Sequence, residues 1–170
     1  MLITPPQANE YGAFYANYIA QVTDDVLFEL KNQVKSVADF MKAIPSEKQH
    51  YAYAEGKWTI KELLGHLVDT ERVMSYRLLR FSRKDSTDLP GFEENDYVLN
   101  STFLQRDFND LIDEFTAVRK SNLYLITSLT EEQLALSGSA NNNKVSVKAL
   151  LFIMAGHVKH HIRILKERYL

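Results

Sequence analysis

Apolar residues recur at intervals of three and four in four long stretches of the chain, and this periodicity most restricts the possible fold. The clearest stretch begins at Leu27 and ends at Ile44. Such spacing places the apolar side chains on one face of an α-helix, because a helix completes a turn about every 3.6 residues. No stretch shows convincing strand alternation. The sequence therefore predicts an all-α protein, a four-helix bundle.

Short polar motifs predict where three of these helices begin. Thr59 and Glu62 have the spacing of a capping box, and Ser146 is placed to cap the last helix. Thr23, which precedes two aspartates, is the predicted N-cap of the first long helix, and Pro45 is predicted to end that helix.

The connection between the second and third predicted helices, DSTDLPGFEENDYVLN, is unusually long. Bundle helices are usually joined by roughly 2–8 residues. A longer connection tends to cross one end of the bundle or to cover a site. We therefore predict a long crossover connection instead of simple up-and-down winding. Glu94 and Asp96 are candidates for the mouth of a pocket, and Trp58 and Tyr97 for its walls. For Trp58 the alternative is a hydrophobic staple with Leu63 at the start of the second helix.

Composition restricts the class of protein. With 170 residues, 45% of them hydrophobic, the chain is predicted to form a single domain, residues 1–170. The net charge of −2 argues against a nucleic-acid partner. The basic residues from Arg77 to Lys84 have two interpretations, a solvated helix end or a docking patch for an anionic substrate. Neither a signal peptide nor a membrane span is recognisable, so we expect a cytoplasmic protein without a membrane partner.

The absence of cysteine restricts the chemistry further. Disulfides, thiolate metal ligands and a catalytic cysteine are all excluded. Any metal must therefore be bound through nitrogen and oxygen atoms. Glu71 lies on the apolar face of the second predicted helix, where a carboxylate is most often paired with an arginine of a neighbouring helix.

Histidines are the best candidates for metal ligands. In AGHVKHHIRIL, His157 and His161 occupy positions on the apolar face of the last helix and lie one turn apart. Both can reach one ion, or both can be hydrogen-bonded core residues. His160 projects away from them. His66 lies on a flank of the second helix, where helical geometry permits it as a third ligand without requiring it.

Three segments together resemble the DinB-like (YfiT-type) metalloprotein superfamily: GKWTIKELLGHLVDTERVMSYRLLRFSRKD, LPGFEENDYV and GHVKHHIRILKERYL. The resemblance covers nearly the whole chain. It implies a four-helix bundle, commonly a homodimer, in which three histidines bind a divalent metal such as nickel or zinc. Carried over to this sequence, the implied ligands are His66, His157 and His161.

The resemblance restricts the reaction less than the fold. Relatives include thiol S-transferases and a maleylpyruvate isomerase that use low-molecular-weight thiols, and others are named hydrolases. We therefore expect a metal-dependent enzyme, a thiol S-transferase or a hydrolase, acting on a small molecule. The alternative is a non-catalytic, metal-binding stress-response homodimer. Asp69, three residues after His66, is the candidate catalytic base or orienter of a ligand, with a surface ion pair as the alternative.

Overall fold

The computed structural model describes residues 2–170 of the chain. Its helices and strands are α1 (Ala16–Ile19), α2 (Val26–Lys42), α3 (Ile60–Ser82), α4 (Glu94–Leu99), α5 (Phe108–Thr127), α6 (Glu131–Ala135), β1 (Ser137–Ala140), β2 (Asn143–Ser146) and α7 (Val147–Ile164). Single 3₁₀ turns lie at Ala8–Glu10, Ala13–Tyr15, Ser46–Lys48 and Phe103–Gln105, and a π-helical turn at Leu165–Tyr169 follows α7.

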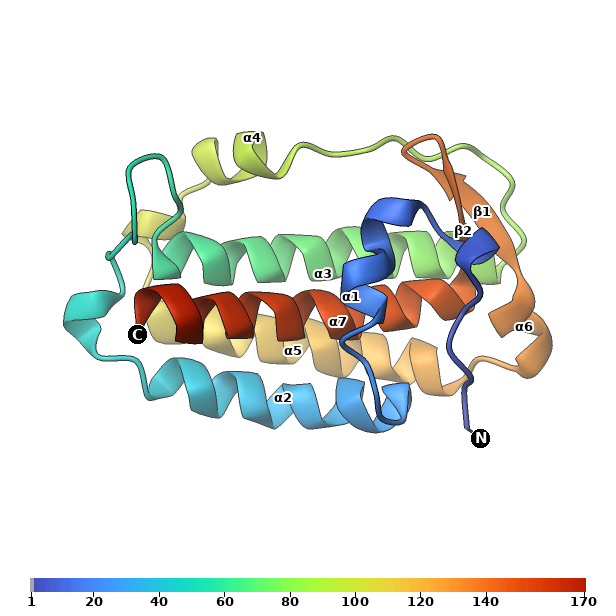
Figure 1. Cartoon of the computed structure of the whole chain (residues 1–170), viewed down its shortest axis with the longest axis horizontal. Helices are drawn as coiled ribbons and strands as arrows, with labels where there is room; N and C mark the ends of the chain where they lie inside the picture. The colour runs from blue at the N-terminus through green and yellow to red at the C-terminus, as the bar shows by residue number, and fades with distance from the viewer. Residues whose placement is uncertain (1) are drawn as a thin grey trace.

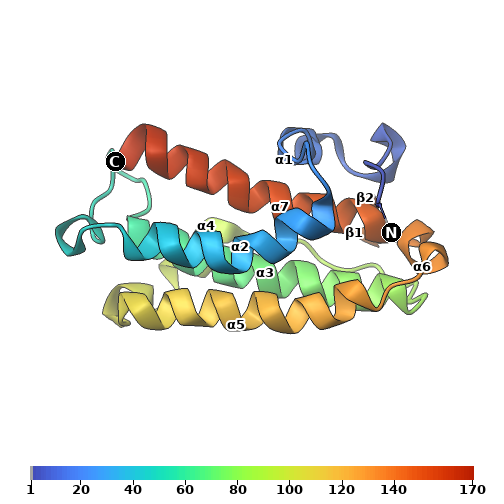
Figure 2. The same cartoon turned by 90° about the horizontal axis from the view of Figure 1, so that it is seen from below.

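Helices α2, α3, α5 and α7 form the predicted four-helix bundle (Figures 1 and 2). Helices α5 and α7 each pack against both α2 and α3, whereas α2 and α3 lie across the bundle from each other. Helices α3 and α5 run in the same direction (Figure 1), so the chain between them returns along the whole length of the bundle and carries α4. The predicted crossover connection is this returning segment.

The capping predictions are confirmed at two helices and corrected at a third. The Thr59 side chain accepts a hydrogen bond from the backbone of Glu62 in a complete capping box at α3, and Ser146 caps α7. At α2, however, Asp25 is the N-cap in place of the predicted Thr23, because its carboxylate accepts hydrogen bonds from the first-turn backbone N–H groups.

A short antiparallel hairpin, β1–β2, corrects the expectation that the chain contains no strands. Asn141 and Asn142 both adopt positive φ angles, 52° and 58°, as a two-residue hairpin turn requires. Leu89, at the start of the returning segment, exchanges backbone hydrogen bonds with Ser139 and Asn141. The hairpin therefore fixes the start of the segment that passes over the bundle.

A buried ion pair joins two helices in the bundle interior. Arg119 of α5 and Glu71 of α3 form a two-pronged ion pair with N–O distances of 2.7 and 2.8 Å, which confirms the predicted partner of Glu71. Gln33 accepts a third hydrogen bond from Arg119, and Asn122 donates one to Glu71. We call these four residues the ion-pair network. No helix within residues 2–170 combines the length and the apolar character that crossing a membrane requires.

Candidate metal centre

Three histidine side chains from two helices meet inside the bundle. His66 lies on α3, and His157 and His161 lie one turn apart on α7. The Nε2 atom of His157 is 3.0 Å from Nε2 of His66 and 3.0 Å from Nε2 of His161. One ring nitrogen from each residue lies within 4.8 Å of the other two. The structure thus brings the three residues close enough to share one ion, and we call them the histidine cluster.

The donor atoms and distances fit a divalent transition metal. A nitrogen ligand lies about 2.0–2.1 Å from zinc, so two ligands of one ion are at most about 4.2 Å apart. The two 3.0 Å separations are within this limit. Imidazole suits zinc, nickel, copper and iron, whereas magnesium and calcium prefer oxygen ligands. A ligand set of three imidazoles therefore fits zinc, nickel, copper or iron better than magnesium or calcium.

Burial keeps these imidazoles neutral. It lowers the pKa of His66 to about 4, and it lowers the pKa values of His157 and His161 well below the ordinary value. The neighbouring imidazoles add to the effect at His157 and His161. At neutral pH a metal would therefore not need to displace protons from these three rings.

Hydrogen bonds within the protein do not satisfy the histidine cluster. Each ring nitrogen is one donor or one acceptor, so Nε2 of His157 can satisfy only one of its two neighbours fully. Nδ1 of His161 is buried and has no hydrogen-bond partner among residues 2–170. At His66, the Thr70 hydroxyl lies 3.5 Å from Nδ1. A hydrogen donated from Nδ1 to Thr70 would leave the Nε2 lone pair of His66 free for a metal.

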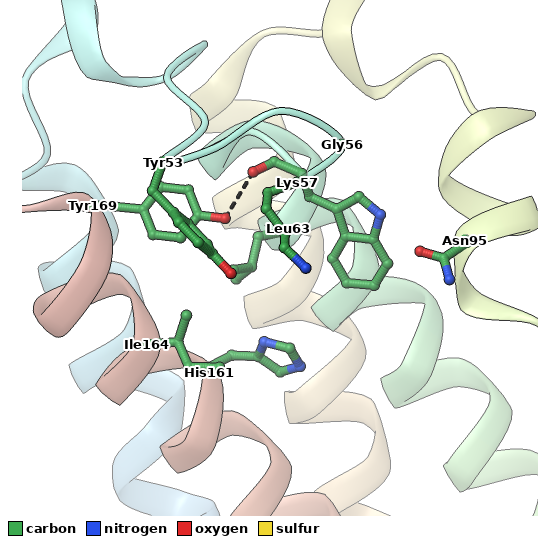
Figure 3. Close-up of a pocket in the computed structure, with 9 residues that line it drawn as sticks. Tyr53, Gly56, Lys57, Leu63, Asn95, His161, Ile164 and Tyr169 are labelled. Atoms are coloured by element: carbon green, nitrogen blue, oxygen red, sulfur yellow. Dashed lines mark hydrogen bonds between the residues drawn. The ribbon is translucent and has the colours of Figure 1, made fainter.

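One cavity, which we call the Trp58 cavity, reaches the histidine cluster at His161 (Figure 3). Its volume is about 210 Å³. The ring of His161 points into it, between Tyr53 and Tyr169 on one side and Asn95 of α4 on the other (Figure 3). The Tyr169 hydroxyl donates a 2.7 Å hydrogen bond to the carbonyl oxygen of Trp58, which ties the C-terminal turn to the loop before α3.

A second cavity, the Arg77 cavity, reaches the cluster at His157 and has a volume of about 230 Å³. The N-terminal segment forms one wall of this cavity through Phe14, Tyr15 and Tyr18. The Tyr18 ring lies edge-on to the His157 ring, with 5.4 Å between the ring centroids. The cluster therefore lies between two cavities that are lined by different histidines.

One glycine directly before His157 and another directly before His66 allow neighbouring segments of the chain to pack closely against α7 and α3. A Cβ at position 156 would lie 1.9 Å from the carbonyl oxygen of Tyr18, and one at position 65 would lie 2.3 Å from the ring of Phe103. Gly156 and Gly65 directly precede His157 and His66. Only glycine therefore permits the present packing of both segments beside the histidine cluster.

Several other residues considered for the site do not contribute to the three converging nitrogens. Asp69 is half-buried, and burial raises the pKa of its carboxyl group. Of the nearby charges, Glu114 also raises this pKa, whereas Arg72 and Arg106 lower it. His160 is partly exposed, and its ring packs against the rings of Tyr18 and His161, with centroid distances of 5.2 and 5.1 Å. In the returning segment Glu94 lines the Arg77 cavity, and Tyr97 lines a neighbouring cavity that Arg77 and Phe92 also line. Asp96 is exposed and lines none of these cavities.

Sequence reasoning missed the contributions of Thr70 and of the N-terminal tyrosines. Thr70 follows His66 by one helical turn, so i, i+4 spacing could have identified it. Trp58, predicted for a pocket wall, packs its ring 4.6 Å from that of His66 and lines the Trp58 cavity. Nothing in the local sequence places Tyr15 and Tyr18 over α7, because that contact joins residues more than 130 positions apart.

Comparisons with known proteins agree with this architecture. The family model of the DinB superfamily matches residues 29–165. The chain is 25% identical over 145 residues to an Oceanobacillus iheyensis protein named "Putative metal-dependent hydrolase", covering 82% of this chain and 81% of the relative.

A solved structure shows the same fold. It is YfiT from Bacillus subtilis, described as a probable metal-dependent hydrolase with an unusual four-helix bundle topology. The TM-score is 0.71 at 16% sequence identity, covering 96% of this chain and 90% of that chain. With the family model matching most of its length, the protein belongs to the DinB superfamily.

Proposed function

We propose that the protein is a metal-dependent enzyme acting on a small molecule, with His66, His157 and His161 as the ligands of one divalent ion. One observation supports this most directly: three buried, neutral imidazoles converge without satisfying one another's hydrogen-bonding capacity. Three protein ligands leave coordination positions open, as catalytic zinc sites do. Zinc or nickel is the expected metal.

The metal, when bound, would act as a Lewis acid that lowers the pKa of a coordinated water or thiol. The protein's own residues have other tasks. Thr70 orients the ring of His66, and the rings of Trp58 and Tyr18 shield the histidine cluster from bulk water. The two cavities bind the reactants beside the ligands. The proposed roles are therefore ligand orientation, exclusion of water and substrate binding.

Hydrolysis and thiol transfer are the two reaction types to consider. The names of the relatives favour a hydrolase. The separate cavities at His161 and His157 favour a transferase, because transfer requires two organic reactants and hydrolysis requires one and water. The second reactant would then be a low-molecular-weight thiol. The earlier expectations of a homodimer, a cytoplasmic location and a catalytic Asp69 remain predictions.

Elemental analysis of protein purified without a histidine tag tests the metal site. We expect about one divalent ion per chain in the wild type and a loss of most of it in His161→Ala. His160→Ala is the matched control, because His160 directly precedes His161 on the same helix but is not one of the three residues whose nitrogens converge. Equal metal content in all three proteins would contradict the proposed ligands.

Activity assays then separate the proposed reactions from the non-catalytic alternative. Zinc- and nickel-loaded protein would be given ester and amide substrates, and electrophiles with and without glutathione or bacillithiol. Turnover that requires the thiol and is lost in His161→Ala supports transfer, and thiol-independent turnover lost in the same variant supports hydrolysis. Stoichiometric metal without turnover in either assay would favour a metal-binding role alone.

A further inference from the structure

Arg77 is a buried cation without an acidic partner. Arg77 is only 3% exposed, yet no carboxylate within residues 2–170 forms an ion pair with its guanidinium. Its Nη2 donates a 3.0 Å hydrogen bond to the carbonyl oxygen of Pro90, and its Nη1 lies 3.9 Å from the sulfur of Met74. Arg77 also interacts with the Tyr15 hydroxyl and lies over the Phe92 ring, 5.8 Å from its centroid, and these contacts together leave part of the capacity of its five N–H donors available.

The neighbouring basic residues do not share this environment. Arg80 pairs with Asp85 at the surface, Lys84 pairs with Glu132, and Arg83 is exposed. The basic stretch recognised in the sequence is therefore a solvated helix end for three residues, and only Arg77 turns inward. Burying a charge without a partner is costly, so an unpaired buried guanidinium suggests an anion that arrives from outside.

The residues around Arg77 indicate the size and polarity of the rest of such an anionic ligand. The Arg77 cavity is walled by Tyr15, Phe92, Met74 and Ile153, which are suited to an apolar body. Its volume of about 230 Å³ equals that of seven or eight waters at roughly 30 Å³ each. His157 lines the same cavity. A ligand held by Arg77 would therefore be small and would extend toward the histidine cluster.

Charge distinguishes a carboxylate from a phosphate as the anion. The cavity contains one arginine, and Glu94 of α4 lines it as an exposed acidic residue. Glu94 repels a dianion more strongly than a monoanion, and the single guanidinium of Arg77 neutralises a monoanion fully but a dianion only by half. A carboxylate also fits the planar fork of an arginine in a two-pronged geometry.

We propose that Arg77 binds the carboxylate of a small apolar carboxylic acid whose other end reaches the histidine cluster. The inference rests on the proposed function in assigning this acid as a substrate, and it names the substrate class. Arg77 then determines specificity, because a neutral analogue of the same shape would lack the charge-assisted hydrogen bonds.

Calorimetric titration of metal-free and zinc-loaded protein with phenylacetate tests the site without requiring turnover. We expect saturable binding to the wild type, at least tenfold weaker binding to Arg77→Met, and partial recovery in Arg77→Lys. Arg83→Gln is the matched control, because Arg83 lies on the same helix end outside the cavity. Glu94→Gln should bind phenylacetate more tightly than the wild type, which provides a test that keeps Arg77 intact.

Three results would overturn the proposal. They are equal binding of phenylacetate to the wild type and to a folded Arg77→Met, equal binding of phenylacetamide and phenylacetate to the wild type, or tighter binding of inorganic phosphate than of phenylacetate. Failure to bind phenylacetate, benzoate or butyrate at millimolar concentration would overturn it as well. Metal analysis of the same samples separates the two proposals, since zinc can bind stoichiometrically while the carboxylate site fails, and the reverse can also occur.

Discussion

The bundle interior contains two polar groups of opposite character, the ion-pair network and the histidine cluster. In the network, Arg119 donates through Nε, Nη1 and Nη2 to oxygens of Glu71 and Gln33, all within 2.8 Å. In the cluster, three nitrogens converge on one another, and Nδ1 of His161 has no partner among the described residues. The donors and acceptors of the network are matched within the protein, whereas those of the cluster are not.

This difference distinguishes a buried polar group that stabilises the fold from one that is suited to binding a ligand. Both groups join α3 to another helix, and all their residues are buried except Asn122, which is half-buried. A network with matched donors and acceptors contributes to the specific arrangement of helices. A cluster of like atoms contributes little to stability until a ligand binds it. The same reasoning distinguishes paired Arg119 from unpaired Arg77.

The largest expected effect comes from breaking the ion-pair network. Arg119→Met leaves the carboxylate of Glu71 buried without its cation, and we expect a loss of about 3–5 kcal/mol in the free energy of unfolding. Urea unfolding of metal-free protein measures this loss. The exposed pair of Lys35 and Asp39 provides the control, since Lys35→Ala should change stability by less than about 1 kcal/mol. Similar losses in both variants would show that the network is not a buried structural unit.

Lowering the pH should destabilise the metal-free protein through His66, by slightly less than Arg119→Met does. His66 takes up a proton near pH 6.5 in the unfolded chain but only near pH 4 in the folded protein. The unfolded state therefore binds more protons between these values, and stability is complete above pH 6.5 and falls as the pH drops toward 4. The contribution of His66 is about 3 kcal/mol from its pKa change.

Urea unfolding of metal-free protein at a series of pH values checks this dependence. His66→Phe should show a shallower slope than the wild type over the same range. An equal slope in both proteins would contradict a buried, neutral His66.

A smaller effect is expected at the orienting contact of the cluster. Thr70→Val removes the hydroxyl beside Nδ1 of His66 while keeping the shape of the side chain. We expect about tenfold weaker zinc binding, the lower end of the range for partners of ligand histidines. Competition with a chelator measures the affinity. Thr116→Val, a change of the same kind at another buried hydroxyl, should leave it unaltered.

The smallest expected effect is that of Asp69→Asn. The charges that act on Asp69 belong to Arg72, Arg106 and Glu114, and the structure shows no hydrogen bond from Asp69 to the histidine cluster within residues 2–170. We expect a stability change below about 1 kcal/mol with zinc affinity retained. A loss of turnover at unchanged metal content would instead support Asp69 as the catalytic base.

The sequence predicted those features that depend on local spacing. The four long helices follow from apolar periodicity, and the caps at Thr59 and Ser146 follow from short motifs. The buried partner of Glu71 followed from the position of a carboxylate on an apolar face. His157 and His161 could be paired because one helical turn separates them, whereas His66 needed the family resemblance.

The features that sequence reasoning missed depend on contacts between distant segments or on a turn signal that was not recognised. Asn141 and Asn142 form the hairpin turn, and consecutive asparagines are suited to its positive φ angles. The two cavities could not be predicted, because their walls combine the N-terminus, the returning segment and α7. The hydrogen bond from Arg77 to the carbonyl oxygen of Pro90 could not be predicted either, because it joins α3 to the returning segment.

The proposed ligands and the walls around them belong to different parts of the chain. The imidazoles are fixed on two long helices, whereas Tyr18, Phe92 and Asn95 come from segments laid over the bundle. Mutations in those outer segments could change which compounds are accepted while the inner coordination geometry stays the same. Selectivity could therefore diversify independently of reactivity, and exchanging the outer segments between homologues is a practical route to redesign.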